Sequence, residues 1–305
     1  MIRIGVMHLI DSLAAGGAER MTVNLINLLP RSSYRPHLCT TRRDGPLARL
    51  VADDVNRLSL KRNHRFDARA FRTMRDYIVE NEISILHAHS TSLFIAAVAS
   101  LFPPHPLLVW HDHYGRYKFD DRPAWLYRLA ATRVSRVIAV NQPLAEWSRQ
   151  KLHMKAQHVE YVSNFVCESE SARPQQLLPG SRGNRIVCVA NFRPEKDHLT
   201  LIGAFDILTQ HYPSAHLLLI GADIEGTYAA QVRAEVRHRR LTDHVSFFGP
   251  RDDVSSILKR CDVGVLSSAS EGLPLALLEY GVAGLPAVAT DVGQCGEVLE
   301  SGRCG

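Results

Sequence analysis

The chain has 305 residues, of which 46% are hydrophobic and 22% charged, and its formal net charge is +5 at pH 7. This balance excludes a disordered or fibrous chain, and the length predicts about two globular domains. The sequence has no apolar run of the roughly 20 residues that a membrane-spanning helix needs, and its start lacks the pattern of a signal peptide. A cytoplasmic protein is therefore expected.

Six scattered cysteines predict reduced, structural thiols rather than a disulfide framework or a zinc ribbon. Much of the excess positive charge lies within residues 42–75. This stretch is interpreted as a solvated helix face. The alternative is a surface that approaches anionic lipid headgroups on the inner face of the membrane. No nucleic-acid partner is expected.

Short apolar runs alternate with segments of helical period along the whole chain, which predicts an α/β protein with a parallel sheet and helices on both faces. In the first half, the clearest strands are residues 2–9, 83–87, 106–111 and 134–140. The clearest helices there are residues 18–29, 67–80, 93–101 and 123–132.

Residues 168–184 are rich in Ser, Pro, Gly, Gln and Arg and predict a linker between an N-terminal domain, 1–167, and a C-terminal domain, 185–305. The second half repeats the alternation, with predicted strands at residues 185–190, 215–220, 245–248, 263–266 and 287–290. Two such series predict two Rossmann-like, doubly wound domains that face each other across a cleft.

The most informative segment of the second half follows the predicted strand 263–266. Glu271 lies in the loop after this strand, Gly272 permits a tight turn, and Pro274 suits the first turn of a helix that carries Glu279. A loop carboxylate beside exposed helix N–H groups suits a ligand with hydroxyls and a phosphate. The alternative is that Glu271 caps the helix and Glu279 is a solvated helix residue.

The run E-G-L-P-L-A-L-L-E, followed by G-L-P-A-V-A-T-D-V-G, resembles the family-4 glycosyltransferases (glycosyl transferases group 1). These are retaining enzymes of the GT-B fold. The resemblance implies a nucleoside-diphosphate sugar as donor, a UDP-sugar or a GDP-sugar. It implies that Glu271 contacts the donor sugar, that Glu279 holds the ribose hydroxyls, and that Gly272, Leu273 and Pro274 form the donor-binding loop.

A second group of charged residues follows the predicted strand 185–190. Arg193 and Lys196 could pair with exposed acids or clamp a diphosphate, and the resemblance assigns them to the leaving diphosphate. Asp197 stands where the family commonly has glycine. Two cations and a helix N-terminus can stabilise the leaving group without a metal, and no Asp-x-Asp motif is evident. No metal and no cofactor are therefore predicted.

Smaller motifs add to the resemblance. Gly16 and Gly17 follow the first predicted strand and resemble the loop on the acceptor side, although glycine pairs also simply make turns. Gly221 and Arg251 end later strands of the second half, and the resemblance places the Arg251 loop near the nucleobase. Asn164 stands where the family often has Asn-Gly.

Two histidine pairs end predicted strands, His87 with His89 and His111 with His113. Alternate residues of a strand share a face, so each pair could bind zinc, but no closely spaced third ligand is apparent. A structural role is the alternative for His87. The resemblance places the histidine that reaches the donor sugar at His113, with His111 as the second choice.

Together these features imply a retaining, metal-independent glycosyltransferase. It would move a sugar to a hydroxyl of a saccharide or lipid-linked acceptor, and no general base is assigned. Two alternatives are a nucleotide-sugar epimerase of the same fold and a non-catalytic protein that binds nucleotide sugars. The second arises because the chain ends at Gly305, before the last strand and helices of the family, so the C-terminal domain is expected to be incomplete.

Overall fold

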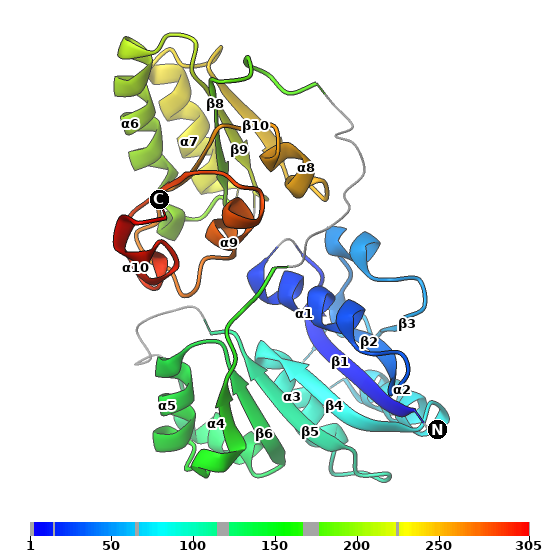
Figure 1. The fold of residues 1–305 in the computed structure, drawn as a ribbon. Coiled ribbons are helices and arrows are strands. Elements are labelled where there is room, and N and C mark those ends of the chain that lie inside the picture. The colour runs from blue at the N-terminus through cyan, green and yellow to red at the C-terminus, as the bar shows by residue number, and fades with distance from the viewer. Residues whose placement is uncertain are drawn as a thin grey trace. The chain divides into compact units, whose positions relative to one another are not determined.

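The computed structural model describes residues 3–14, 16–64, 67–114, 122–166, 177–223 and 226–304. The chain divides into two compact units, Met1–Asn164 and Phe165–Gly305 (Figure 1). Part of the predicted linker, 168–176, lies outside the described residues. Its remainder packs onto the second unit, because Leu178 is buried and the Arg185 guanidinium donates to the carbonyl oxygens of Leu178, Pro179 and Gly180.

The first unit contains a seven-stranded parallel sheet in the order β3-β2-β1-β4-β5-β6-β7. This is the order of a doubly wound fold, in which all strands are parallel and the strand order reverses between β1 and β4. The strands are β1 (Ile4–Ser12), β2 (Tyr34–Arg43), β3 (Asn56–Ser59), β4 (Ile83–His89), β5 (Leu107–Asp112), β6 (Val134–Ala139) and β7 (Val159–Tyr161).

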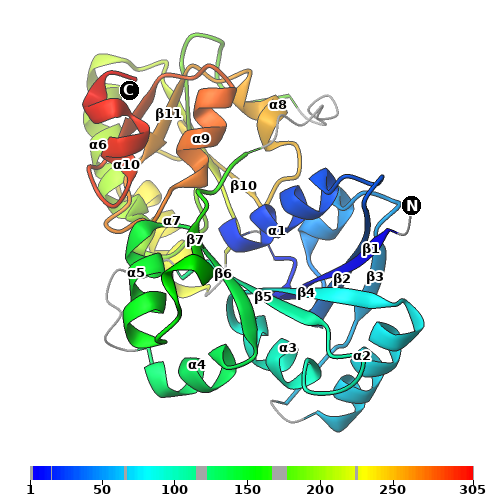
Figure 2. The same ribbon diagram turned by 60° about the horizontal axis from the view of Figure 1, so that its bottom comes forward.

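Helices cover both faces of this sheet. Figure 2 shows α1 on one side and α2, α3 and α4 on the other, as the reversal between β1 and β4 requires. The helices are α1 (Gly17–Leu28), α2 (Ala68–Glu80), α3 (Leu93–Ala99), α4 (Ala124–Ala131) and α5 (Gln142–Lys151). Alternate strand residues serve the two faces: Leu86 and Trp110 join the core beneath α2–α5, whereas Ile10 packs with Val23 and Ile26 of α1.

The second unit repeats the topology with a five-stranded parallel sheet in the order β10-β9-β8-β11-β12. Its strands are β8 (Arg185–Val189), β9 (His216–Ile220), β10 (Val245–Gly249), β11 (Val263–Leu266) and β12 (Ala287–Ala289). Its helices are α6 (His198–His211), α7 (Thr227–His238), α8 (Val254–Leu258), α9 (Leu275–Val282) and α10 (Cys295–Val298), and they frame the sheet in Figure 1. The α/β class and the doubly wound architecture predicted from the sequence are confirmed.

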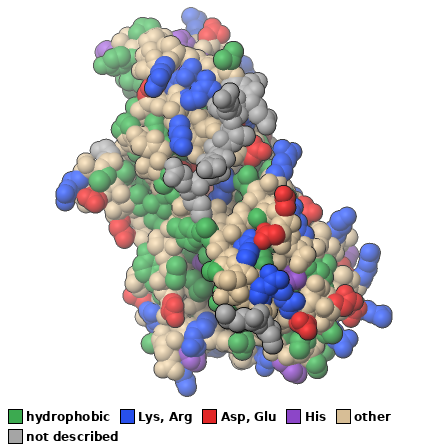
Figure 3. Space-filling model, turned by 45° about the vertical axis from the view of Figure 1, so that its right-hand side comes forward, with side chains coloured by type: hydrophobic (Ala, Val, Ile, Leu, Met, Phe, Trp, Pro, Cys, Tyr) green, Lys and Arg blue, Asp and Glu red, His purple; other side chains and the backbone are tan. Residues whose placement is uncertain are grey.

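The structure shows where the excess positive charge of the sequence lies. Residues 42–75 do not form one helix, but the arginines of this stretch that lie on α2, namely Arg69, Arg72 and Arg75, are exposed as predicted. On the face presented in Figure 3, Lys and Arg side chains form separate groups with Asp and Glu between them.

The five described cysteines are free thiols, and Cys167 lies outside the described residues. Among the helices in the described ranges, none combines the length and apolar character needed to cross a bilayer.

Candidate functional site

The loops that follow β8 and β11 carry Arg193, Lys196 and Glu271, three of the charged residues predicted for the donor site. These two strands are parallel neighbours in the sheet, and the strand order reverses between them. Ligands of doubly wound folds bind outside the carboxyl ends of the strands at such a reversal. Lys196 follows β8 and Glu271 follows β11, so the topology alone brings these two residues to the same place.

Lys196 and Glu271 form an ion pair. The distance between Lys196 Nζ and Glu271 Oε1 is 2.5 Å, and Ser268 Oγ lies 2.6 Å from the same oxygen. Glu271 is buried, with 6% of its surface exposed, whereas the Lys196 side chain keeps 24%. Two donors therefore meet on one carboxylate oxygen, and the compensating cation remains accessible from solvent.

The Lys196 loop is fixed by Asp197. Its backbone lies in the left-handed region, with φ 45° and ψ 49°, and its carboxylate accepts from the backbone N–H and the hydroxyl of Thr200, so it caps α6. Ser267 Oγ then donates toward the carbonyl oxygens of Lys196 and Asp197. An aspartate therefore adopts the backbone conformation that glycine adopts most easily.

The Glu271 loop packs tightly against the segment after β12. A Cβ on Gly293, whose φ is +58°, would lie 2.3 Å from the Glu271 carbonyl oxygen, so only glycine fits there. Gln294 N–H donates to the carbonyl of Gly272, and Thr290 Oγ1 donates to the carbonyl of Ser268. These contacts hold Gly272, at the start of the loop that continues through Leu273 to Pro274, against the segment that follows β12.

Helix α9 begins after Pro274 and carries Glu279 in its second turn, as predicted, and the structure shows this side chain partly buried. The next residue, Tyr280, is fully buried and anchors the helix to the sheet. Val189 N–H donates to Tyr280 Oη at 2.9 Å, and this hydroxyl lies 3.2 Å from the carbonyl oxygen of Val265. A Cβ on Gly264 would lie 2.4 Å from the Tyr280 ring, so the absence of a side chain there makes room for the anchor.

The other predicted residues of this unit lie around the same sheet edge. Arg193 is half-exposed, and its closest carboxylate is that of Glu195, at 4.0 Å. A Cβ on Gly221 would lie 2.0 Å from the Ala190 carbonyl, so the chain after β9 passes directly over the chain after β8. Arg251 makes a bidentate ion pair with Asp253, with distances of 2.7 and 2.6 Å.

In the first unit, Gly16 and Gly17 lie between β1 and α1. Gly16 is the N-terminal cap residue of α1, and a Cβ there would meet the Glu19 carboxylate. Asn164 ends this unit, and its Oδ1 is buried without a hydrogen-bond partner. The predicted cleft between the two units remains a prediction.

The predicted histidines lie side by side on β4 and β5. The register pairs His89 with His111, and His113 follows β5 and stacks on His111 with ring centroids 4.1 Å apart. His89 Nδ1 lies 3.0 Å from His113 Nε2. Burial lowers the pKa of His113 to about 3 and that of His87 to about 4, so both rings are neutral at pH 7.

Asp112 separates His111 from His113 and points to the opposite face of the sheet. There the Arg122 guanidinium makes a bidentate ion pair with it, at 2.7 and 3.0 Å. Both side chains are buried, and the guanidinium carbon lies 4.2–5.2 Å from the ring centroids of Trp110, Tyr114, Tyr127 and Trp147. This ion pair fixes the strand end between the two histidines.

Two contributors were not predicted. Ser268 holds the Glu271 carboxylate, and its only sequence signal was its place at the end of a buried strand. His8 of β1 joins the histidines of β4, because the register pairs it with His87 and its Nδ1 lies 3.0 Å from His89 Nε2. The sequence showed no third histidine close to the two pairs; the fold brings His8 to them from about 80 residues away.

Comparison with known proteins agrees with this fold. Residues 15–170 match the family Glycosyltransferase Family 4, and residues 169–305 match glycosyl transferases group 1. The chain therefore belongs to the family-4 glycosyltransferases. It is 26% identical to EpsF of Bacillus subtilis (strain 168), over 94% of this chain and 79% of that protein. It is 23% identical to an Escherichia coli UDP-Gal:alpha-D-GlcNAc-diphosphoundecaprenol alpha-1,3-galactosyltransferase, over 95% of this chain and 80% of that protein.

Solved structures share the fold at lower identity. Anabaena Alr3699/HepE in complex with UDP and glucose superposes with a TM-score of 0.75 at 20% identity, covering 97% of this chain and 83% of that chain. WaaG, a glycosyltransferase involved in lipopolysaccharide biosynthesis, gives a TM-score of 0.70 at 16% identity, covering 98% of this chain and 85% of that chain. The fold is thus that of the GT-B glycosyltransferases.

Proposed function

We propose that this glycosyltransferase takes a sugar from a nucleoside-diphosphate sugar and transfers it, with retention and without a metal, to a hydroxyl of a saccharide or lipid-linked acceptor. The ion pair between Lys196 and Glu271 carries the proposal. It joins a cation suited to a diphosphate and a carboxylate suited to sugar hydroxyls at the strand reversal of the second unit. If this ion pair served only stability, it could lie anywhere in the unit and would not need to lie where the strand order reverses.

Each residue then has a distinct part. Lys196 and Arg193 stabilise the negative charge that develops on the diphosphate as it leaves, together with the N–H groups at the start of α9. Glu271 holds the donor sugar beside the reacting carbon. Glu279 accepts hydrogen bonds from the ribose hydroxyls, and the Arg251 loop lies near the base. His113 contacts the donor sugar from the first unit.

The transfer breaks the bond between the anomeric carbon and the diphosphate oxygen. The acceptor oxygen forms its bond to the same face of that carbon, and the departing phosphate oxygen accepts the acceptor proton. This sequence needs no base from the protein, and we assign none. The cations act where charge develops in the transition state, which is where electrostatic stabilisation accelerates a reaction.

The relatives support these substrate classes. The Escherichia coli relative is named for UDP-galactose as donor and for a diphosphoundecaprenol-linked acceptor, and the Anabaena protein was solved with UDP-glucose. Another relative is a Vi polysaccharide biosynthesis protein of Salmonella typhi. A lipid-linked saccharide and a role in polysaccharide biosynthesis are therefore proposed for this chain.

The proposed site of action is the cytoplasmic face of a membrane. Helix α4 exposes Trp125 and Leu129, one turn apart, with 69% and 66% of their surfaces accessible. An aromatic and an aliphatic side chain on one exposed helix face suit shallow insertion at a lipid interface. Sedimentation with anionic vesicles tests this contact: a double substitution of Trp125 and Leu129 to Ser is expected to reduce the bound fraction, and equal binding would contradict it.

Calorimetry with the full chain tests the donor site. A panel of nucleoside diphosphates identifies the base, and Glu279→Ala is expected to weaken the selected nucleotide by roughly 10 to 100-fold, since hydrogen bonds to a charged group contribute about 1.5–3 kcal/mol. Glu235→Ala on α7 serves as the matched control because that carboxylate pairs with Arg239 on the surface. Unchanged affinity of the Glu279 variant would contradict the assignment.

The reaction itself is tested by incubating the protein with the matching nucleotide sugar, with and without a lipid-linked saccharide. Product that forms only with the acceptor, and whose new linkage keeps the donor's anomeric configuration, supports the proposal. An epimerised nucleotide sugar without acceptor indicates an epimerase instead. Tight nucleotide binding with no turnover over a broad acceptor panel indicates a non-catalytic binding protein.

A further inference from the structure

Five histidines form one continuous group on the first unit, which we call the histidine ladder. Its members are His8 of β1, His87 and His89 of β4, and His111 and His113 at the end of β5. The register pairs His8 with His87 and His89 with His111. Since side chains alternate along each strand, all five rings lie on the face opposite the core beneath α2–α5.

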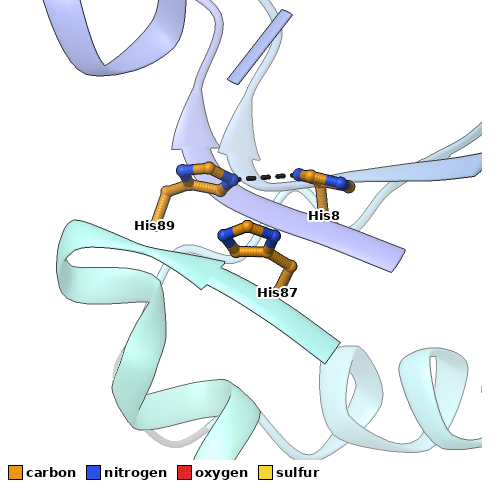
Figure 4. Close-up of side chains that lie close together, drawn as sticks. All are labelled: His8, His87 and His89. Atoms are coloured by element: carbon orange, nitrogen blue, oxygen red, sulfur yellow. Dashed lines mark hydrogen bonds between the residues drawn. The ribbon is translucent and has the colours of Figure 1, made fainter. Parts of the chain in front are cut away.

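Contacts run along the whole ladder. His8 Nδ1 lies 3.0 Å from His89 Nε2, and His87 Nε2 lies 3.3 Å from His111 Nδ1. The rings of His87 and His89 stack with centroids 4.6 Å apart and an interplanar angle of 9°. Figure 4 shows the His87 ring against the contact between His8 and His89. Burial lowers the pKa of all five, so each neutral ring carries a nitrogen lone pair.

Hydrogen bonds within the ladder leave some of its nitrogens unused. His8 Nε2, His111 Nε2 and His113 Nδ1 are buried without a partner. His8, His89 and His111 are themselves at most 1% exposed. A buried polar atom without a partner costs about 1–3 kcal/mol, and a sheet could avoid this with apolar residues. A metal ion held by His8 and its neighbours on β4 would offset the part of this cost that falls on His8 Nε2.

We propose that His8, His87 and His89 bind a transition metal ion, Zn²⁺ in the first instance. One nitrogen from each ring lies within 4.8 Å of the others. Two nitrogens of a tetrahedral zinc site lie about 3.3 Å apart, given Zn–N bonds of about 2.0–2.1 Å, so binding requires these rings to turn one nitrogen each toward a common point. Three imidazoles without thiolate or carboxylate suit Zn²⁺ and its neighbours Cu²⁺ and Ni²⁺ rather than Mg²⁺ or Ca²⁺.

Position selects this triad over the second one that the ladder offers, His89 with His111 and His113. All three proposed ligands lie within strands β1 and β4, and these strands flank the reversal of the sheet in the first unit. Ligands on strands are held more precisely than ligands beyond a strand end, where His113 lies. The reversal is also where doubly wound sheets bind ligands.

Zinc titration of the full, chelator-treated chain tests the site by calorimetry, with metal content measured after dialysis. One ion per chain is expected. His8→Asn and His87→Asn are each expected to lower the zinc affinity by more than about 10-fold, because even the loss of a residue that only supports a ligand costs about 10 to 100-fold. His37→Asn is the matched control, because His37 is buried on the adjacent strand β2 and contacts Tyr77 instead.

A spectroscopic reading does not depend on the variants folding. In the wild-type chain, zinc is expected to shift the ring ¹⁵N resonances of three histidines, and Co²⁺ is expected to give the intense visible absorption of a tetrahedral ion. Wild-type protein that retains no zinc overturns the proposal. So does equal zinc affinity in the His8 and His87 variants, or loss of binding only in His113→Asn, which would assign the ion to the second triad.

Discussion

Lys196 and Glu271 are 75 residues apart in sequence, yet the lysine ammonium contacts the buried carboxylate at 2.5 Å. The same contact compensates the charge of Glu271 in the absence of donor and keeps a cation at the strand reversal. The proposal gives the two members of this pair different parts, diphosphate binding for Lys196 and sugar contact for Glu271, and substitutions of each member separate these contributions.

Lys196→Met is expected to weaken nucleoside-diphosphate binding by roughly 10 to 100-fold, because one charge-assisted contact with the phosphates is lost. Glu271→Gln is expected to lower the transfer rate while leaving nucleoside-diphosphate affinity within about threefold, since its proposed contact is with the sugar. Calorimetry and initial rates measure the two effects. Lys259→Met, on an exposed lysine of the same unit, is the control, and equal nucleotide affinity in the two lysine variants would count against the phosphate assignment.

Asp197 allows a test of how the Lys196 loop keeps its shape. Asp197→Gly is expected to change the free energy of unfolding by no more than about 0.5 kcal/mol, because glycine caps helices acceptably and adopts a positive φ without strain. Asp197→Ala is expected to cost about 1–3 kcal/mol, since it loses the cap and strains the backbone. Urea denaturation measures both. A glycine variant as unstable as the alanine variant would contradict this account.

The buried ion pair of Arg122 and Asp112 predicts a large stability effect. Arg122→Met is expected to lower the free energy of unfolding by about 3–5 kcal/mol, because it leaves the Asp112 carboxylate buried without its cation. Arg72→Ala serves as the surface control, since its exposed pair with Asp76 spans 3.9 Å and contributes less than about 1 kcal/mol. Similar losses in both variants, measured by denaturant unfolding, would show that burial of the pair is unimportant.

His198 predicts a pH dependence of stability in the second unit. It is buried against Phe192, and burial lowers its pKa to about 4, from about 6.5 in the unfolded chain. Between these values the unfolded state takes up a proton that the native state does not. The stabilisation is therefore complete above about pH 6.5 and is lost as the pH falls toward 4, at up to about 1.4 kcal/mol per pH unit.

His198→Gln removes this titration, so its free energy of unfolding is expected to fall less steeply than that of the wild type between pH 6.5 and 4. The difference in slope is the measured quantity, and it does not depend on whether the variant is less stable overall. His211→Gln, on an exposed histidine of the same helix, should retain the wild-type slope. Identical slopes in wild type and His198→Gln would refute the prediction.

Much of the fold followed from the sequence because its apolar runs are short and regular. The strand β11 was predicted with its observed ends, since Val263–Leu266 is bounded by a polar residue and a Ser pair. Strand β2 was missed because Pro36 and several polar residues interrupt its pattern, although its centre is buried. β7 has three residues, too few to show a period.

The site was predicted unevenly for a related reason. Glu271 and Glu279 share one local segment, and their spacing carried the signal. The ion pair between Lys196 and Glu271 forms because β8 and β11 are neighbours in the sheet. The alternation of strands and helices predicted this doubly wound topology, but no local pattern marked the pair itself. The histidine ladder did not follow from any local pattern, because its members meet only through the registers of β1 with β4 and of β4 with β5.

Tyr280 has a practical consequence for anyone who selects variants of this enzyme. It follows Glu279 directly in α9. A shift of Tyr280, which anchors α9 to Val189 and Val265, therefore also shifts Glu279, the residue proposed to hold the ribose. A methyl group at Gly264 would push on the Tyr280 ring and, through it, on the ribose contact. A screen that scores only product would therefore record Gly264 as a donor-site position, although its substitution acts from inside the core.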